Sequence, residues 1–231
     1  MFAVVLGVAQ QAVCESPLLP ALAAPGDPAS WQVMGLPKQK IPYTRFSDAE
    51  VAGHRAIRIE ADNAYGNLVH TTRVLNPPHT LSWQWRIETL NSAADLRHKN
   101  TDDTSLKVCV FFDLDLKNIP FFERQLLRLA RQRSATPLPG ATVCYVWDPT
   151  LPEGTTLANA YTNRVRYIVA AQGGEAAEWR SVNRDIAVDF RRLFGEESRE
   201  IPPLIGIGIG ADSDNTHQRS VGYVADLVLA P

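Results

Sequence analysis

Short runs of β-type residues recur along the chain, and many of them alternate apolar with polar side chains. The clearest run is residues 80–88, whose apolar face carries Leu81, Trp83, Trp85 and Ile87. This alternation predicts a half-buried strand with both tryptophans in the core, in preference to a paired platform that stacks on a sugar ring. The predicted strands cover residues 54–61, 67–74, 80–88, 106–114, 142–148, 164–171, 178–183, 204–210 and 222–229.

Two segments have helical periodicity instead. Residues 121–133 place an apolar stripe on one side and arginines elsewhere, which predicts a helix that covers one sheet edge. The stripe consists of Phe122, Leu126, Leu129 and Ala130. Residues 185–194 begin with an acidic turn, end with basic residues and are followed by Gly195 in the C-cap position, which predicts a second helix.

Many short strands separated by turn signals favour a sandwich or barrel over alternating β and α units. The sequence therefore predicts a mainly β fold, a two-sheet antiparallel β-sandwich of the jelly-roll kind with one or two peripheral helices. No internal repeat or low-complexity segment divides the 231 residues, so residues 25–231 are expected to form a single domain.

The first 24 residues need a separate interpretation. Phe2 to Val13 is short and apolar, and residues 21–26 carry the small side chains that precede and follow a signal-peptide cleavage site. However, no lysine or arginine precedes Lys38, so the basic start of a signal peptide is missing. Residues 1–24 are expected to be either a signal peptide, which implies a periplasmic or secreted protein, or an N-terminal arm packed on the domain.

Two cysteines bear on whether the protein is periplasmic or secreted. Cys109 and Cys144 each lie in the middle of a predicted strand. They could form a disulfide if those strands are neighbours and the compartment is oxidising. The simpler interpretation is a pair of buried free thiols that act as small apolar residues.

The composition excludes several classes of protein. Hydrophobic residues make up 45% and charged residues 21% of the chain, which are ordinary values for a globular domain. The formal net charge of -2 provides no general attraction to nucleic acid, so no nucleic-acid partner is expected. No uninterrupted apolar stretch has the length of a transmembrane segment.

Arginines at alternate strand positions give part of a sheet face a polar character. Arg86 and Glu88 share one predicted face, and Arg166 and Arg180 lie on two other strands. Such a face is either plain solvated surface or a groove for a polar or anionic ligand, because the guanidinium group matches carboxylate, phosphate and sulfate. In a groove, the ligand-binding residues are expected to be Arg86, Glu88, Asp103, Trp147, Arg166, Arg180, Asp212 and Asp214.

Acidic residues gather in two predicted loops. Asp102 and Asp103 lie in the first, and the run ADSDNT at residues 211–216 forms the second, just before the last strand. Alternating oxygen-bearing side chains suit a hard cation such as calcium, although aspartates in turns also commonly cap their own backbone. If a structural calcium ion is bound, its expected ligands are Asp212, Asp214, Asn215 and Asp226.

Signatures of enzymes are mostly missing from the sequence. The five histidines have no metal-ligand spacing, the cysteines form no zinc pairs, and no nucleophile elbow, phosphate loop or dinucleotide fingerprint occurs. Carboxylates alone can support acid–base hydrolysis, but no particular pair stands out. Binding is therefore favoured over catalysis.

The order of several segments resembles a bacterial family called domain of unknown function 3047. The segments include LSWQWRIE at 81–88, LKVCVFFD at 106–113 and IGIGIGADSDNT at 205–216. The resemblance implies an exported protein of Gram-negative bacteria with no assigned activity. The strand pattern is also similar to galactose-binding-like jelly rolls, which include carbohydrate-binding modules. In those modules an aspartate near the last strand often ligates structural calcium, and Asp226 is similar in position.

Three functions follow as hypotheses. The first is a non-catalytic binding domain of the bacterial cell envelope that recognises a polar or anionic glycan-like ligand. The second is a carbohydrate-active enzyme, such as a polysaccharide lyase or hydrolase, on a jelly roll. The third is a structural or interaction subunit of an envelope complex, with a protein partner.

Overall fold

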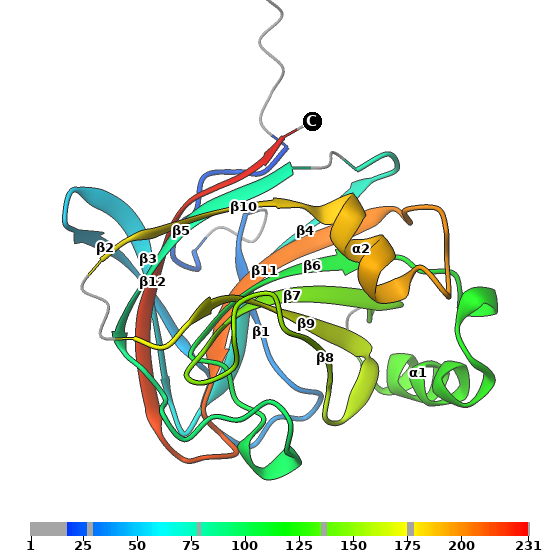
Figure 1. The fold of residues 1–231 in the computed structure, drawn as a ribbon, viewed down its shortest axis with the longest axis horizontal. Helices are drawn as coiled ribbons and strands as arrows, with labels where there is room; N and C mark the ends of the chain where they lie inside the picture. The colour runs from blue at the N-terminus through cyan, green and yellow to red at the C-terminus, as the bar shows by residue number, and fades with distance from the viewer. Residues whose placement is uncertain (1–17, 27–29, 78–79, 135–137, 175–177, 231) are drawn as a thin grey trace, which may run out of the picture.

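The computed structural model describes residues 18–26, 30–77, 80–134, 138–174 and 178–230. Two β-sheets pack against each other, and the two helices lie together at one side of the molecule (Figure 1). The mainly β sandwich predicted from the sequence is confirmed. Most of the segment interpreted as a signal peptide or arm, residues 1–17, lies outside the described residues.

The larger sheet has seven strands, and all described neighbours in it are antiparallel except β7 and β9. Its order is β1 (Gln32–Met34), β4 (Tyr65–Val74), β11 (Leu204–Asp212), β6 (Leu106–Phe112), β7 (Ala141–Asp148), β9 (Thr162–Gln172) and β8 (Thr156–Asn159). The smaller sheet has five antiparallel strands. Its order is β10 (Arg180–Asp185), β5 (Thr80–Thr89), β12 (Arg219–Ala230), β3 (His54–Asp62) and β2 (Arg45–Val51).

Every strand predicted from the sequence is present, with shifts of a few residues at the ends. Strands β1, β2 and β8 were not predicted. β1 and β8 are short, and β2 is an edge strand of sequence RFSDAEV in which charged residues dilute the alternation.

The core between the sheets is rich in aromatic side chains. Trp83 and Trp85 both point inward from β5, as predicted, and their ring centroids are 5.4 Å apart. Across the sandwich, the ring of Trp85 meets that of Trp147 on β7, again with centroids 5.4 Å apart. The alternation of β5 thus positions its tryptophans against the larger sheet.

Helix α2 (Ile186–Phe194) begins where the sequence predicts. The side chain of Asp185 accepts hydrogen bonds from the backbone N–H groups of Ala187 and Val188, both at 2.9 Å, which caps the helix. Phe190 is buried, and its ring lies 4.9 Å from that of Phe112 on β6. This apolar contact and the cap fix α2 on the sandwich.

Helix α1 (Phe121–Arg133) has the predicted bounds but not the predicted orientation. Of its residues, Leu127 alone is buried, whereas Phe122, Leu126 and Leu129 are exposed. The stripe predicted to cover a sheet edge therefore faces solvent. In the chain, this helix lies between η2 (Leu116–Asn118) and β7. Polar contacts described below hold it in its orientation.

Cys109 on β6 and Cys144 on β7 stand directly opposite each other and form a disulfide. The interpretation of these residues as free thiols is therefore wrong. The sequence could not decide the question because pairing depends on β6 and β7 being neighbours, which is a property of the sheet order. In the described part of the chain, no helix has both the length and the apolar character needed to cross a membrane.

Candidate functional site

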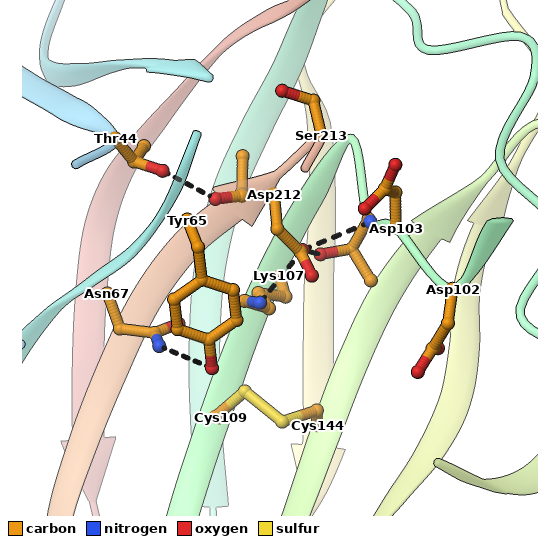
Figure 2. A network of polar contacts seen from close by, with 12 residues as sticks. Thr44, Tyr65, Asn67, Asp102, Asp103, Lys107, Cys109, Cys144, Asp212 and Ser213 are labelled. Atoms are coloured by element: carbon orange, nitrogen blue, oxygen red, sulfur yellow. Dashed lines mark hydrogen bonds and ion pairs between the residues drawn. A yellow bond between two sulfur atoms is a disulfide. The ribbon is translucent and has the colours of Figure 1, made fainter. Parts of the chain in front are cut away.

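A network of polar side chains lies at one end of the larger sheet, where β4 and β6 begin and β11 ends (Figure 2). It contains three buried carboxylates, those of Asp102, Asp103 and Asp212, and the partly buried carboxylate of Asp214. The loop before β6 and the loop after β11 supply them. The two acidic loops predicted from the sequence are thus neighbours in the fold.

Asp212 is held by a buried cation. Its Oδ1 lies 2.8 Å from Nζ of Lys107 and also accepts hydrogen bonds from the backbone N–H and the hydroxyl of Thr104. Burial lowers the pKa of Lys107, but the charge and hydrogen bond of Asp212, together with the nearby Tyr65 and Asp102, raise that pKa above its ordinary value. Nζ of Lys107 also lies 4.8 Å from the ring centroid of Tyr65. Lys107 is therefore a permanent cation inside the network.

Asp103 links the two loops. Its carboxylate accepts hydrogen bonds from the backbone N–H groups of Asn215 and Thr216, at 3.2 and 2.7 Å, and from the Thr216 hydroxyl at 2.6 Å. The side-chain amide of Asn215 donates to the same carboxylate at 3.2 Å. The 211–216 loop was expected either to cap itself or to bind calcium; Asp103, more than a hundred residues earlier, now provides its main cap.

Lys107 compensates the charges of the remaining two carboxylates, Asp102 and Asp214, only in part. Burial, followed by repulsion from Asp212, raises the pKa of Asp102 from 3.8 to about 7. Burial, followed by repulsion from Asp212 and Asp103, raises the pKa of Asp214 to about 6. Asp102 accepts a hydrogen bond from the amide of Asn159 at 2.6 Å, and the Oδ1 atoms of Asp102 and Asp214 have no hydrogen-bond partner among the described residues.

Three of these carboxylates have a spacing that suits a metal ion. One oxygen each from Asp103, Asp212 and Asp214 lies within 4.8 Å of the others, and calcium takes oxygen ligands of this kind. Asn215 is close to them, but its side-chain oxygen accepts a hydrogen bond from the Tyr161 hydroxyl at 3.1 Å. The donor set therefore fits a hard cation, with Lys107 already supplying part of the positive charge.

Asp226 does not belong to this group. It lies on β12 in the smaller sheet, where its side chain is 61% exposed and accepts a hydrogen bond from Gln84 at 3.0 Å. Including it among the calcium ligands was wrong, because β12 carries the chain away from the 211–216 loop. Asp103, which was expected only to contact a ligand, takes its place among the candidate metal ligands.

The arginines predicted to line a groove do not converge. On the smaller sheet, Arg180 pairs with Trp85 and Arg86 pairs with Tyr223, so Arg180 and Arg86 point to opposite faces. Arg166 belongs to the larger sheet. Glu88, near Arg86, accepts a hydrogen bond from the Tyr223 hydroxyl.

Trp147 is a core residue. It is 1% exposed, its indole N–H donates to the carbonyl of Gly173 at 2.6 Å, and the guanidinium of Arg180 lies 4.7 Å from its ring centroid. The prediction that Trp147 contacts a ligand was therefore wrong. Trp147 lies one residue before the end of β7, and the Arg180 side chain covers its ring there.

A different group of arginines does converge. A hollow of about 600 Å³ at the C-terminal end of α2 is lined by Arg166, Arg191, Arg192 and Arg199, together with Leu193, Gly195 and Glu196. We call it the arginine hollow. Arg166 is the one member that the groove prediction contained.

The four guanidinium groups of the arginine hollow are held differently. Arg166 pairs with Glu197, donates to the carbonyl of Leu193 and lies 4.1 Å from the Phe194 ring centroid. Arg192 donates to the carbonyl of Gly154 at 3.0 Å. Among the described residues, no carboxylate lies within ion-pair distance of the other arginines that line the hollow, so their charges face solvent.

The sequence contained a partial signal for this site. Arg191 and Arg192 were noted as basic residues late in a helix, where they complement the helix dipole, and that role needs no ligand. Their gathering with Arg166 depends on how α2 packs beside β9. Lys107 was missed because a lysine within an apolar strand gives no indication of its partner.

Comparison with known proteins bears on identity. A search of curated proteins gives no match. Among solved structures, endoglucanase 3 of family GH12 from Trichoderma harzianum is similar with a TM-score of 0.44 and 9% identity, covering 89% of this chain and 99% of that chain. The native endo-1,4-β-glucanase CelB2 gives a TM-score of 0.41 and 9% identity, covering 92% and 97%. Both likenesses are too distant to bear on activity.

A protein-family model also matches the chain. The family model described as "Protein of unknown function (DUF3047)" matches residues 29–228, which is most of the chain and nearly all of both sheets. The resemblance noted in the sequence is therefore confirmed, and the protein belongs to the DUF3047 family.

Proposed function

We propose that this protein is a non-catalytic binding protein of the bacterial cell envelope, and that the arginine hollow holds an anionic, glycan-like ligand. The observation that carries the proposal is the convergence of Arg166, Arg191, Arg192 and Arg199 on one hollow. Like charges gathered at a surface repel each other, and a bound anion removes that repulsion. The repulsion among the four arginines therefore destabilises the free protein, and a bound anion would offset that destabilisation.

The chemistry of arginine supports an anionic group with a planar or branched set of oxygens. Guanidinium groups donate paired hydrogen bonds to carboxylate, sulfate and phosphate. The formal net charge of the chain is -2, so attraction of an anion must come from a local cluster of cations such as this one. Uronate and phosphorylated sugars combine such groups with a polar ring.

The disulfide supports an oxidising compartment. The bridge between Cys109 and Cys144 lies in a buried apolar cluster with Leu96, Val146 and Tyr167. Structural disulfides of this kind persist in periplasmic and secreted proteins and are rare in the reducing cytosol. We therefore place the proposed activity in the periplasm or outside the cell.

The carboxylate network supports a structural role better than a catalytic one. Asp102, Asp103 and Asp212 are all buried, so a polymeric substrate cannot reach them without movement of the loops. General acid–base catalysis requires hydrogen-bond reach to the scissile bond. We propose instead that Asp103, Asp212 and Asp214 hold a divalent cation such as calcium, which would neutralise their excess charge and tie the two loops together.

Calorimetry tests the proposed ligand. Titration with an oligogalacturonate is expected to show binding that a neutral maltooligosaccharide of the same length does not share. Arg191→Ala/Arg199→Ala should weaken binding by at least about tenfold, since each hydrogen bond to a charged group contributes about 1.5–3 kcal/mol. The matched control is Arg55→Ala/Arg73→Ala, which removes the same charge elsewhere. Equal binding by both double variants would overturn the proposal.

A further inference from the structure

Helix α1 presents its large apolar side chains to solvent. Phe122 is 81% exposed, Leu126 is 66% exposed and Leu129 is 50% exposed. Because they are spaced by four and three residues, these side chains lie on one side of the helix and form a continuous stripe. We call Phe122, Leu126 and Leu129 the apolar stripe. Isolated exposed leucines are ordinary, whereas this stripe places three large apolar side chains together on one side of a helix.

Contacts on the opposite side of the helix hold the stripe outward. Leu127 is the buried residue of α1. Glu123 forms an ion pair with Arg164 at 2.5 Å and accepts a hydrogen bond from the Asn163 amide at 2.9 Å. Near the other end, Arg131 donates to the carbonyl of Leu138 at 2.9 Å. These contacts fix how the helix is rotated, so exposure of the stripe is a property of the fold.

The charges around the stripe are positive. Helix α1 carries one acidic residue, Glu123, and that carboxylate is already paired with Arg164. Against it stand four basic residues, Arg124, Arg128, Arg131 and Arg133. The helix therefore has a net positive charge on a chain whose formal net charge is -2.

The arginine hollow lies on the same side of the molecule. Arg164 pairs with Glu123 of α1 and also with Glu197, to which Arg166 of the hollow is bonded. Figure 1 shows α1 and α2 together at this side, with α2 following directly after β10. The basic helix and the arginine hollow are thus joined through Arg164 and Glu197.

We propose that α1 is an interfacial helix that docks the protein on an anionic lipid bilayer, with the apolar stripe inserted among the lipids. Phe and Leu on one face of a helix whose polar face is rich in arginine are typical of helices that lie in the membrane interface. At 13 residues α1 is about 20 Å long, so it lies along the surface and does not cross it.

A second copy of the chain fits this surface less well. A helix face about 20 Å long and about 10 Å wide is far below the about 800 Å² that each partner of a stable dimer buries. Two such faces brought together would also place the arginines of both copies side by side. A bilayer with anionic headgroups avoids both difficulties.

Cosedimentation with vesicles tests the proposal, using the full chain. Vesicles of equal parts phosphatidylglycerol and phosphatidylcholine are expected to bind the protein, and vesicles of phosphatidylcholine alone are expected to bind it at least about tenfold more weakly. Phe122→Ser/Leu126→Ser should reduce binding to the anionic vesicles by at least about tenfold. Leu75→Ser/Val228→Ser, which changes two exposed apolar residues elsewhere, should leave it unchanged.

Both double variants change exposed residues, so both are expected to fold, and circular dichroism checks that they do. The proposal is overturned if anionic vesicles do not bind the protein, or if the stripe variant binds them as well as the control variant does. It is also overturned if the stripe drives dimer formation in sedimentation equilibrium without vesicle binding. Calorimetry with the oligogalacturonate is independent of these outcomes, so this inference and the proposed ligand can fail separately.

Discussion

Lys107 and Asp212 form an ion pair at the end of the larger sheet, with Nζ and Oδ1 2.8 Å apart and each side chain 6% exposed. The pair joins β6 to β11, and Asp212 leads directly into the loop that Asp103 caps. Its geometry therefore connects the sheet to both acidic loops.

Removing the lysine should destabilise the protein strongly. In Lys107→Met the Asp212 carboxylate stays buried without its cation, and breaking a buried pair in this way costs about 3–5 kcal/mol. Urea unfolding measures the loss. Lys117→Met is the control, because Lys117 and its partner Asp115 are both exposed and such pairs contribute about 0–1 kcal/mol. Equal losses in the two variants would show that the Lys107 pair is not a structural element.

Glu60 predicts how stability depends on pH. Burial raises the pKa of Glu60, but hydrogen bonds from Arg58, Arg219 and Arg45 outweigh burial and lower it from 4.5 to about 2. The carboxylate protonates in the unfolded chain before it does in the folded one. Its stabilising contribution is therefore present above about pH 4.5 and is lost as the pH falls toward about 2.

The corresponding variant is Glu60→Gln. Between about pH 7 and about pH 3 the wild-type protein should lose on the order of 1–3 kcal/mol more than this variant, because the arginine partners are partly exposed and solvent screens them. Glu50→Gln, at an exposed position of the neighbouring strand β2, should follow the wild-type protein. If the Glu60 variant loses as much stability as the wild type, the proposed pairing fails.

The disulfide should contribute measurably to stability. Cys109 and Cys144 are 35 residues apart in sequence, and a bridge that closes a loop of this kind typically contributes about 2–4 kcal/mol. The free energy of unfolding, measured by denaturant unfolding with and without reductant, should differ by this amount in the wild-type protein. In Cys109→Ala/Cys144→Ala it should not differ. Alkylation of both cysteines in the denatured, unreduced protein would contradict the pairing.

The proposed cation predicts a response to calcium. With calcium at about 100 times its dissociation constant, binding adds about 2.7 kcal/mol to the free energy of unfolding. For a chain of this size that corresponds to a rise in melting temperature of several degrees, on the order of 2–4 °C per kcal/mol. Asp214→Asn should abolish the rise and Asp95→Asn should keep it. A melting temperature that is the same in calcium and in chelator would contradict the proposed calcium site.

The sandwich could be predicted because the alternation of apolar and polar residues that marks a strand lies within that strand's own sequence. The alternation in residues 80–88 fixed which side of β5 is buried, and Asp185 with Gly195 marked the ends of α2. The orientation of α1 was not predictable in the same way. Its apolar stripe has ordinary helical spacing, and the contacts of Glu123 with Arg164 and of Arg131 with Leu138 turn that stripe outward.

The candidate sites were predictable only in part, because each depends on which strands are neighbours. Asp212 and Asp214 were predicted as metal ligands from their loop, but the third carboxylate near them, Asp103, comes from another loop that the sheet order brings close. Arg166 was predicted as a ligand contact, and the arginines beside it at the end of α2 were not. Arg86 and Arg180 show the converse, since residues on paired strands can still face opposite sides of a sheet.

Mapping of backbone amide chemical shifts locates the anionic ligand on the protein. On titration with the oligogalacturonate, the largest shifts are predicted at Arg191, Arg192, Leu193, Gly195 and Arg199, with smaller ones at Arg166. The neutral maltooligosaccharide should move none of them. Shifts that gather instead at the outer face of β5 and β12 or around Asp103, or that are missing at saturating ligand, would contradict the account.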